Sequence, residues 1–252
     1  MGKIIAVSNQ KGGVGKTSTC INLAAGIALK GKKVLLCDID PQGNATTGLG
    51  VEKGALKKSV YNVLIGDASA KETVKKTAVK NLDILPSNAD LAGAEVELVS
   101  ARGRDKKLKD ALNTIRDEYD YIFIDCPPAI GILTINALAS CDGVLVPIQS
   151  EFYALEGLAQ LMNTFKLVKK SLNPSIEIEG VLVTMFDGRA LVSRQTKEEI
   201  VKFFGKKVFK TVIPRNVRVS EAPSYGQPIM LYDKKCKGTA AYNALVEEFL
   251  GR

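Results

Sequence analysis

The stretch SNQKGGVGKTS, residues 8–18, constrains the fold of this chain more than any other part of it. An apolar run, residues 4–7, precedes it and CINLAAGIAL follows it, which is the pattern of a strand, a glycine-rich loop and the start of a helix. Glycine adopts backbone angles that are closed to other residues and leaves room for an anion, so we expect Gly12, Gly13 and Gly15 to wrap phosphate oxygens. The pattern predicts a nucleotide-binding loop.

Two side chains at the end of this loop have the chemistry that a bound triphosphate requires. Lys16 can reach the β- and γ-phosphates, and the Thr17 hydroxyl is placed to bind Mg²⁺. The backbone amides of the helix that begins near Lys16 would point at the anion, where the helix dipole is positive. We therefore expect ATP to be bound by Lys11, Gly12, Gly13, Val14, Gly15, Lys16, Thr17 and Ser18.

The loop departs from the general pattern G-x-x-x-x-G-K-[ST], because Gln10 stands where glycine is expected and Lys11 follows it. A second lysine is redundant within one subunit, since Lys16 already serves the terminal phosphates, but it makes sense if Lys11 reaches a nucleotide held by a neighbouring subunit. The variant loop K-G-G-V-G-K-T resembles the deviant Walker A family of ATPases, which includes ParA-type partition proteins, MinD-type division-site proteins and the nitrogenase iron protein. The resemblance implies that Lys11, together with Lys16, is catalytic and is donated across an ATP-bound sandwich homodimer.

Composition narrows the chemistry and the compartment. The chain has no histidine, which excludes a histidine general base or metal ligand, so hydrolysis would depend on carboxylates, lysines, Mg²⁺ and positioned water. The five cysteines show no C-x-x-C spacing, which predicts buried reduced thiols in a cytoplasmic protein and weighs against the nitrogenase branch. They are Cys20, Cys37, Cys126, Cys141 and Cys236.

Apolar runs alternate with helical periodicity along almost the whole chain, which indicates an α/β fold of the P-loop NTPase type. Because the strands are continuous Val/Ile/Leu runs spaced by helices, we expect a mostly parallel twisted sheet with helices on both faces. The expected strands are 3–8, 33–38, 82–86, 121–125, 143–148, 178–184 and 208–213, and the expected helices are 15–29, 88–99, 104–118, 131–140, 153–171, 193–204 and 238–249. We expect one domain over 1–252, with no N-terminal helix-turn-helix domain and no helix that spans a membrane.

A second informative run, KVLLCDIDPQGNATT, covers residues 33–47. Its strand ends in Asp38 and Asp40, and a proline-led loop follows. Ligands of parallel sheets bind at the carboxyl ends of the strands, so this loop is interpreted as a switch at the γ-phosphate rather than an ordinary polar loop. D-x-D-P-Q-G-N resembles a motif of the same family, which implies that Asp40 orients or activates the attacking water. For Asp38, a place in the Mg²⁺ shell and a role in fixing the loop both stay open.

A third run, YIFIDCPP, places Asp125 at the end of an apolar strand. This is the Walker B arrangement, in which Asp125 would hold Mg²⁺ beside Thr17, directly or through water. We expect residues 125–134 to form a second switch that senses the γ-phosphate.

The run TVIPRNVRVSEAPSYGQP, residues 211–228, shows no clear periodicity and is expected to be an irregular loop. Together with EFYALEGLAQL, residues 151–161, it resembles the chromosomal ParA or Soj subgroup. The resemblance implies that Pro214 and Asn216 frame the adenine of ATP.

Basic residues concentrate in one part of this chain, whose net charge is +8. Between residues 185 and 218, nine basic residues face three acidic ones. Because few aromatic residues lie among them, phosphate contacts without sequence readout fit better than stacking on single strands, although a solvated basic face is the alternative. The family resemblance implies that Arg189, Arg215 and Arg218 contact duplex DNA nonspecifically.

The resemblance as a whole implies a cytoplasmic, nucleoid-associated ATPase that dimerises on ATP and segregates chromosomes or plasmids. A ParB-type centromere-binding partner would stimulate its hydrolysis of ATP. The alternative is a MinD-like membrane-cycling ATPase, which needs a C-terminal amphipathic helix with basic flanks. Here the end reads TAAYNALVEEFLGR, with Glu247 and Glu248 where basic residues should be, so we expect its apolar residues to dock on the domain and no stable membrane association. A third hypothesis, a ligase resembling dethiobiotin synthetase, lacks a substrate pocket that the sequence identifies.

Overall fold

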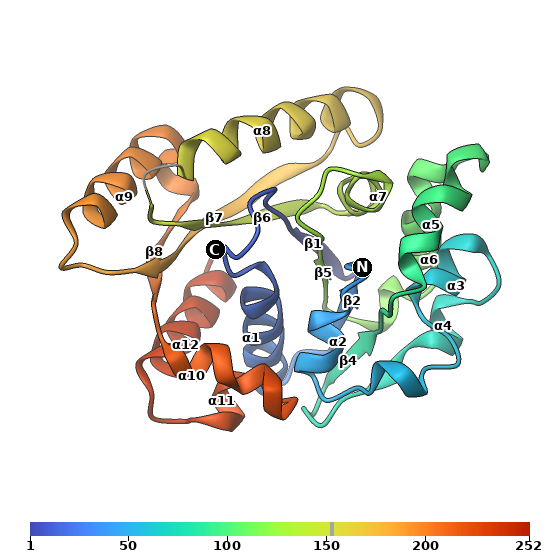
Figure 1. Ribbon diagram of the computed structural model, residues 1–252, viewed down its shortest axis with the longest axis horizontal. Helices are drawn as coiled ribbons and strands as arrows, with labels where there is room; N and C mark the ends of the chain where they lie inside the picture. The colour runs from blue at the N-terminus through green and yellow to red at the C-terminus, as the bar shows by residue number, and fades with distance from the viewer. Residues whose placement is uncertain (152–153) are drawn as a thin grey trace.

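The strands of the computed structural model, which describes residues 1–151 and 154–252, form an eight-stranded sheet in the order β3-β4-β2-β5-β1-β6-β7-β8 (Figure 1). The pairs from β4 to β8 are parallel, and β3 alone runs antiparallel to its neighbour β4. The predicted α/β class and parallel sheet are confirmed, and the short β3 is an addition. The bounds are β1 (Lys3–Val7), β2 (Val34–Asp38), β3 (Lys75–Lys76), β4 (Leu82–Leu85), β5 (Tyr121–Asp125), β6 (Gly143–Gln149), β7 (Glu177–Phe186) and β8 (Val208–Pro214).

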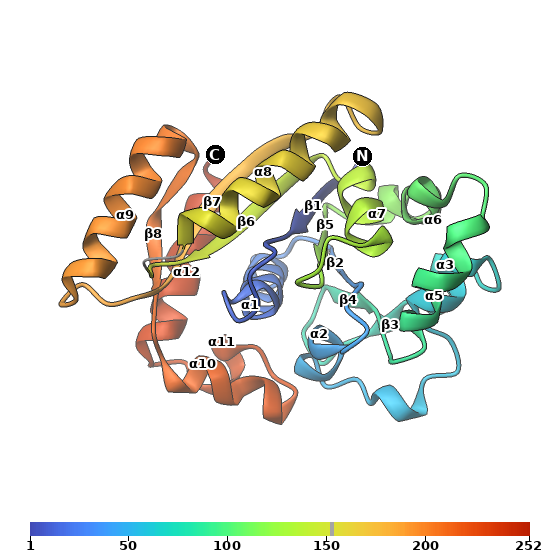
Figure 2. The ribbon, with the colours of Figure 1, turned by 45° about the horizontal axis from the view of Figure 1, so that its top comes forward.

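Helices cover both faces of the sheet, as Figures 1 and 2 show. The long ones are α1 (Lys16–Leu29), α7 (Ile132–Ser140), α8 (Ala154–Ser171), α9 (Leu191–Phe204) and α12 (Lys237–Leu250). The predicted helices 88–99 and 104–118 are shorter than expected, because α5 (Leu91–Glu97) and α6 (Lys107–Asn113) are flanked by 3₁₀ turns. Residue 153, the predicted start of α8, and residue 152 of the run 151–161 lie outside the described residues.

Five short helices were not predicted, namely α2 (Asn44–Gly48), α3 (Val60–Ile65), α4 (Ala70–Thr73), α10 (Val217–Glu221) and α11 (Ile229–Tyr232). Helices of four to six residues are too short to show a 3.6-residue period, so periodicity could not find them. The expectation that 211–228 is an irregular loop was therefore wrong at α10. The proline-led loop after Asp40 likewise continues into α2.

The two faces of each central strand enter two separate parts of the core. In β1, Ile4 and Ala6 pack into one apolar cluster, whereas Ile5 packs into the other, and all three are fully buried. A sheet buried on both sides explains why its strands read as continuous apolar runs instead of alternating ones. Burial on both faces also fixes the register, because a shift by one residue would exchange the two clusters.

The last helix, α12, packs on the sheet as the sequence predicted. Tyr242 and Leu245 are buried, and the Phe249 ring lies 5.8 Å from Tyr121 and 5.9 Å from Phe123, measured between ring centroids. The apolar side of α12 is thus part of the core. Among the described helices, none combines the length and the apolar character needed to cross a bilayer.

The prediction of reduced, buried thiols holds for four of the cysteines. Cys20, Cys37, Cys126 and Cys141 are free and buried. Cys236 is partly exposed, and its sulfur accepts a hydrogen bond from the Thr239 amide at the start of α12.

The register of the sheet brings the predicted motifs together at the carboxyl ends of its strands. Asp125 of β5 pairs with Asp38 of β2 on one side and with Val7 of β1 on the other. All three strands are parallel and end here, so the loops that follow them emerge side by side. This edge carries the candidate site.

Candidate nucleotide site

The loop between β1 and α1 is shaped by glycines that take left-handed backbone angles. Gly13 has φ +72° and Gly15, the residue before α1, has φ +86°, a region that disfavours residues with a Cβ. A Cβ added at Gly12 or Gly13 would meet no heavy atom within 4 Å, so the inner side of the loop faces open space. The loop leads directly into α1, whose positive end suits an anion.

Residues from three predicted motifs line one cleft of about 360 Å³ at this edge. Asp40 comes from the loop after β2, and Pro128 comes from the loop after β5. Met185, which the sequence analysis did not single out, lies near the end of β7 and has φ +50°, a strained value for a residue with a side chain. The lining residues are Gly12, Gly13, Gly15, Lys16, Thr17, Ser18, Asp40, Gln42, Asn44, Pro128 and Met185.

Lys16 is held inside the cleft by the loop itself. Only 7% of the residue is exposed, and its Nζ donates a hydrogen bond to the carbonyl oxygen of Lys11 at 3.1 Å. Burial lowers the pKa of Lys16, and the charge of Asp125 opposes this shift. An anion in the cleft would give the Lys16 ammonium group an oppositely charged partner in place of the neutral carbonyl.

Asp125 is fully buried, and neither of its carboxylate oxygens has a hydrogen-bond partner within the described residues. Burial raises its pKa well above the usual range, and the charge of Asp38 adds to this, while nearby Thr17 and Lys16 act in the opposite direction. Buried polar atoms are rarely left without partners, so this carboxylate is suited to a cation.

The donor set around Asp125 fits magnesium. No group of three or more His, Cys, Asp or Glu side chains in the described part of the chain could hold a metal by itself. Mg²⁺ does not need such a cage, because it is held by one or two carboxylates together with water and substrate phosphates. Asp125 and the Thr17 hydroxyl supply that partial shell beside the phosphate loop.

Asp38 is also buried, but both of its carboxylate oxygens accept hydrogen bonds. It accepts hydrogen bonds from the Asp40 amide at 3.1 Å, the Thr46 amide at 2.8 Å and the Thr46 hydroxyl at 2.7 Å. Burial raises the pKa of Asp38 to about 6, although the hydrogen bonds from Thr46 and Asp40 lower it. Of the two roles left open for Asp38, these bonds favour fixing the loop.

Asp40 reaches the cleft from a loop that is anchored on both sides. Its Oδ1 accepts a hydrogen bond from the Gln42 amide at 2.9 Å, and its carbonyl accepts one from the Ser87 hydroxyl at 2.8 Å. The Ser87 amide in turn donates to the Thr46 hydroxyl at 2.9 Å. Sequence reasoning missed Thr46 and Ser87, because nothing local marks a residue that supports a loop from another strand.

Pro214 is the last residue of β8 and Asn216 follows the strand, and neither residue lines the phosphate cleft. The Asn216 side-chain oxygen caps α10 by accepting hydrogen bonds from the amides of Arg218 at 2.9 Å and Val219 at 3.4 Å. Val14 lies in the phosphate loop with its side chain in the core, and its carbonyl accepts a hydrogen bond from the Thr184 hydroxyl at 2.8 Å. Contact of Pro214 and Asn216 with adenine stays a prediction.

The three arginines assigned to DNA are exposed, with 93% of the side chain accessible in Arg189, 71% in Arg215 and 56% in Arg218. Each lies beside a carboxylate. The nitrogen–oxygen distances are 3.2 Å from Arg189 to Asp187, 3.8 Å from Arg215 to Glu151, and 2.9 Å from Arg218 to Glu221. Two of these acids lie outside residues 185–218, so the local positive charge is smaller than the count along the sequence suggested.

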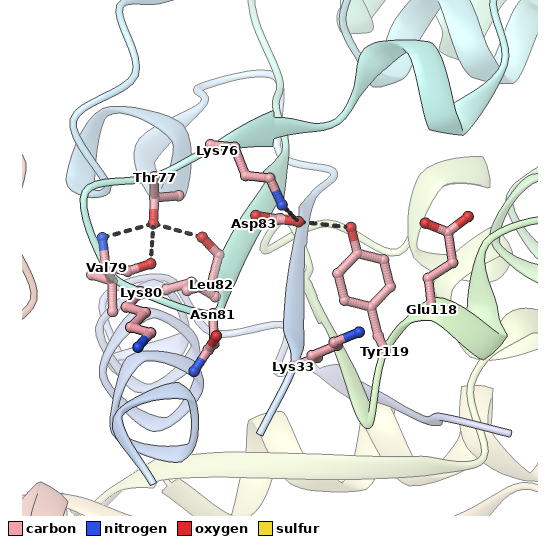
Figure 3. Close-up of a pocket in the computed structure, with 10 residues that line it drawn as sticks. All are labelled: Lys33, Lys76, Thr77, Val79, Lys80, Asn81, Leu82, Asp83, Glu118 and Tyr119. Atoms are coloured by element: carbon pink, nitrogen blue, oxygen red, sulfur yellow. Dashed lines mark hydrogen bonds and ion pairs between the residues drawn. The ribbon is translucent and has the colours of Figure 1, made fainter. Parts of the chain in front are cut away.

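A second hollow, of about 390 Å³, lies at the other end of the strands, where β2, β4 and β5 begin (Figure 3). Three of its polar side chains, Lys76, Asp83 and Tyr119, pair with one another. Lys76 Nζ lies 2.8 Å from Asp83 Oδ2, and the Tyr119 hydroxyl donates to the same oxygen at 3.0 Å (Figure 3). Burial, followed by the charge of Asp83, raises the pKa of Tyr119. None of the predicted site residues lines it.

Comparison with known proteins agrees with this geometry. Residues 2–178 match the AAA domain family. The chain is 56% identical over 248 residues to the sporulation initiation inhibitor protein Soj of Bacillus subtilis, covering 98% of both chains. It is 52% identical over 252 residues to the chromosome partitioning protein ParA of Myxococcus xanthus, covering 100% of this chain and 89% of the relative.

One similar solved structure contains a bound nucleotide analog and a metal ion. Cobyrinic acid a,c-diamide synthase from Mycobacterium smegmatis, with bound ATP analog and magnesium, matches with a TM-score of 0.88 at 35% identity. The match covers 100% of this chain and 98% of the synthase chain.

Proposed function

This chain belongs to the Soj/ParA family of partitioning ATPases, and from that premise we propose that it binds ATP with Mg²⁺, dimerises, and holds duplex DNA without reading its sequence. A ParB-type centromere-binding partner would stimulate hydrolysis and return the protein to the free state. The observation that carries the proposal is the single cleft in which the phosphate loop, Asp40 and the loop after Asp125 meet.

Different residues of the cleft would bind the phosphates, the metal and the attacking water. The loop amides and Lys16 bind the phosphates, and Thr17 and Asp125 would hold the metal. Bound Mg²⁺ would neutralise charge on the β- and γ-phosphates. Asp40, fixed by the Gln42 amide, would orient the attacking water, a role that fits a chain without histidine because phosphoryl transfer depends mostly on positioning and charge.

The position of Lys11 supports its proposed action on a second subunit. It does not line its own cleft, and its Nζ lies 3.3 Å from Glu151 on the surface of the chain. Lys16 already occupies the phosphate side. A lysine placed at the rim can reach a nucleotide that faces it across a dimer.

Dimerisation would make DNA binding depend on ATP. Each subunit contributes one set of exposed arginines, Arg189, Arg215 and Arg218, and two sets on one body bind with higher avidity than either set alone. Phosphate contacts of this kind are sequence-independent and sensitive to salt. Such a cycle would keep the protein in the cytoplasm, on the nucleoid.

The MinD-like alternative is less consistent with α12. A membrane helix must expose its apolar side, but Tyr242, Leu245 and Phe249 are buried in the core. On the outer side of α12, Glu247 forms an ion pair with Lys30, the residue after α1, where a membrane helix would carry basic residues. The likeness to the synthase, at lower identity than the partitioning relatives, supports the ATP site and the fold.

The test combines size measurement and DNA binding. With ATP and Mg²⁺, we expect dimers and a gel shift of random duplex DNA that weakens with added salt, whereas ADP should give neither. Lys16→Ala should abolish nucleotide binding and both effects. Binding to anionic liposomes without binding to DNA would contradict the proposal and favour the membrane-cycling alternative.

A further inference from the structure

Glu151 connects two residues that come from distant parts of the chain. Its Oε2 lies 3.3 Å from Lys11 Nζ, and its Oε1 lies 3.8 Å from a guanidinium nitrogen of Arg215. Lys11 follows β1, Glu151 follows β6 and Arg215 follows β8, so the parallel sheet brings all three to the same edge. The sequence predicts a function for both cations and none for this carboxylate.

The chain around Glu151 fixes the position of its carboxylate. The Glu151 amide donates to the Gln149 carbonyl at 2.8 Å, and the Gln149 side-chain amide donates to Glu151 Oε1. The preceding residue, Ser150, is buried, with its hydroxyl 2.7 Å from the Ser193 hydroxyl and its amide donating to the Thr184 carbonyl at 3.3 Å. Because these bonds already hold the half-exposed Glu151 carboxylate in place, its side chain loses little conformational entropy when it pairs with a cation.

We propose that Glu151 is a positioning residue that holds Lys11 on its own subunit and thereby sets the threshold for ATP-dependent dimerisation. This inference rests on the proposed function of Lys11 as a lysine lent to the opposite subunit. To reach a nucleotide there, Lys11 has to leave Glu151. The triphosphate of the facing subunit, with more negative charge than one carboxylate, replaces it as the partner of the ammonium group.

Arg215 compensates Glu151 when Lys11 leaves. A carboxylate left alone near bound ATP would be repelled by the phosphates, and the guanidinium group beside it removes part of that penalty. Loss of Glu151 and loss of Arg215 therefore act in opposite directions. Removing the carboxylate should ease dimerisation, whereas removing the arginine should hinder it.

The size of the effect follows from the exposure of the pair. Lys11 is 34% and Glu151 49% exposed, and ion pairs of this kind change an equilibrium by up to about fivefold. A dimer breaks two such pairs. We therefore expect the protein concentration for half-maximal dimerisation with ATP to fall roughly 3- to 10-fold in Glu151→Gln.

The first experiment tests the contact in the nucleotide-free protein. Lysines are acetylated briefly with a small amine-reactive ester, and the modification of each lysine is measured by mass spectrometry. Lys11 should react about two- to fivefold faster in Glu151→Gln than in wild type, because the free amine is less restrained. Glu118→Gln is the matched control, since Glu118 is 50% exposed and pairs with Lys71 at 2.8 Å; it should release Lys71 and leave Lys11 unchanged.

The second experiment measures dimerisation by analytical ultracentrifugation with ATP and Mg²⁺ and without DNA. Glu151→Gln should dimerise at lower concentration, Arg215→Ala at higher concentration, and Glu151→Asp, which keeps the charge, close to wild type. Unchanged Lys11 labelling in Glu151→Gln would overturn the contact even if dimers form. A wild-type protein that stays monomeric with ATP would instead overturn the proposed function and the threshold with it.

Discussion

Replacing Thr46 by valine tests whether the Asp40 loop is held from outside the nucleotide cleft. The Thr46 hydroxyl donates to Asp38 Oδ2 at 2.7 Å and accepts from the Ser87 amide at 2.9 Å, and all three residues are fully buried. Valine keeps the branched shape of threonine and replaces its hydroxyl with a methyl group, which neither donates nor accepts a hydrogen bond. The Ser87 amide then loses its acceptor, and the Asp38 carboxylate loses one of its three donors.

The magnitude follows from these two losses. A buried polar group left without its partner costs about 1–3 kcal/mol, so Thr46→Val should lower the free energy of unfolding by about 2–5 kcal/mol. In a chain of this size about 1 kcal/mol corresponds to roughly 2–4 °C in Tm, so the midpoint should fall by about 4–20 °C. ATP hydrolysis should fall as well, because Ser87 also holds the Asp40 carbonyl.

The loss should depend on pH in a defined direction. Because the pKa of Asp38 is raised in the folded state to about 6, the folded chain takes up this proton more readily than the unfolded chain, and its stability falls as pH rises from about 4 to about 6. The Thr46 hydroxyl favours the ionised form, so its removal raises the pKa of Asp38 further. The difference between Thr46→Val and wild type should therefore be larger at pH 8 than at pH 5.

Urea denaturation of the nucleotide-free protein at both pH values measures this difference. Thr46→Ser keeps the hydroxyl and is the control, with an expected loss of about 1 kcal/mol for the missing methyl group. If the valine variant is as stable as the serine variant at pH 8, the network does not support the loop and the reasoning fails.

Three further predictions concern the cleft and the basic surface. Asp125→Asn should raise the Tm of the nucleotide-free protein by a few degrees, because a neutral amide is not repelled by Asp38 as an ionised carboxylate is, and should abolish the dependence of ATP binding on Mg²⁺; calorimetry with and without Mg²⁺ checks both. Asp40→Ala should keep ATP-dependent dimers and DNA binding but lose hydrolysis, and a normal rate of phosphate release would contradict its role with water. Arg218→Ala should weaken DNA binding and reduce its salt dependence with ATP hydrolysis retained, measured beside Lys106→Ala on the exposed start of the 104–118 segment, which should leave DNA affinity unchanged.

The sequence was sufficient where a function depends on contiguous residues. The glycines and Lys16 lie within one loop, and the apolar strand and the helix on either side fix its direction, so the loop could be recognised without knowledge of the rest. The same holds for the seven longer strands, whose continuous apolar runs follow from burial on both faces. These features are formed by residues that are contiguous in the chain, so they can be recognised from the sequence alone.

Only the tertiary structure decided what lies next to what. The order of the strands buries Asp125 and places Asp38 beside it, although 86 other residues separate the two along the chain; burial, and then the charge of Asp38, raises the pKa of Asp125. The tertiary structure also places the Thr46 hydroxyl at hydrogen-bond distance from the Ser87 amide, and the Glu151 carboxylate beside both Lys11 and Arg215. Such partners are set by register and by the shared edge of a parallel sheet, and no spacing in the sequence encodes them.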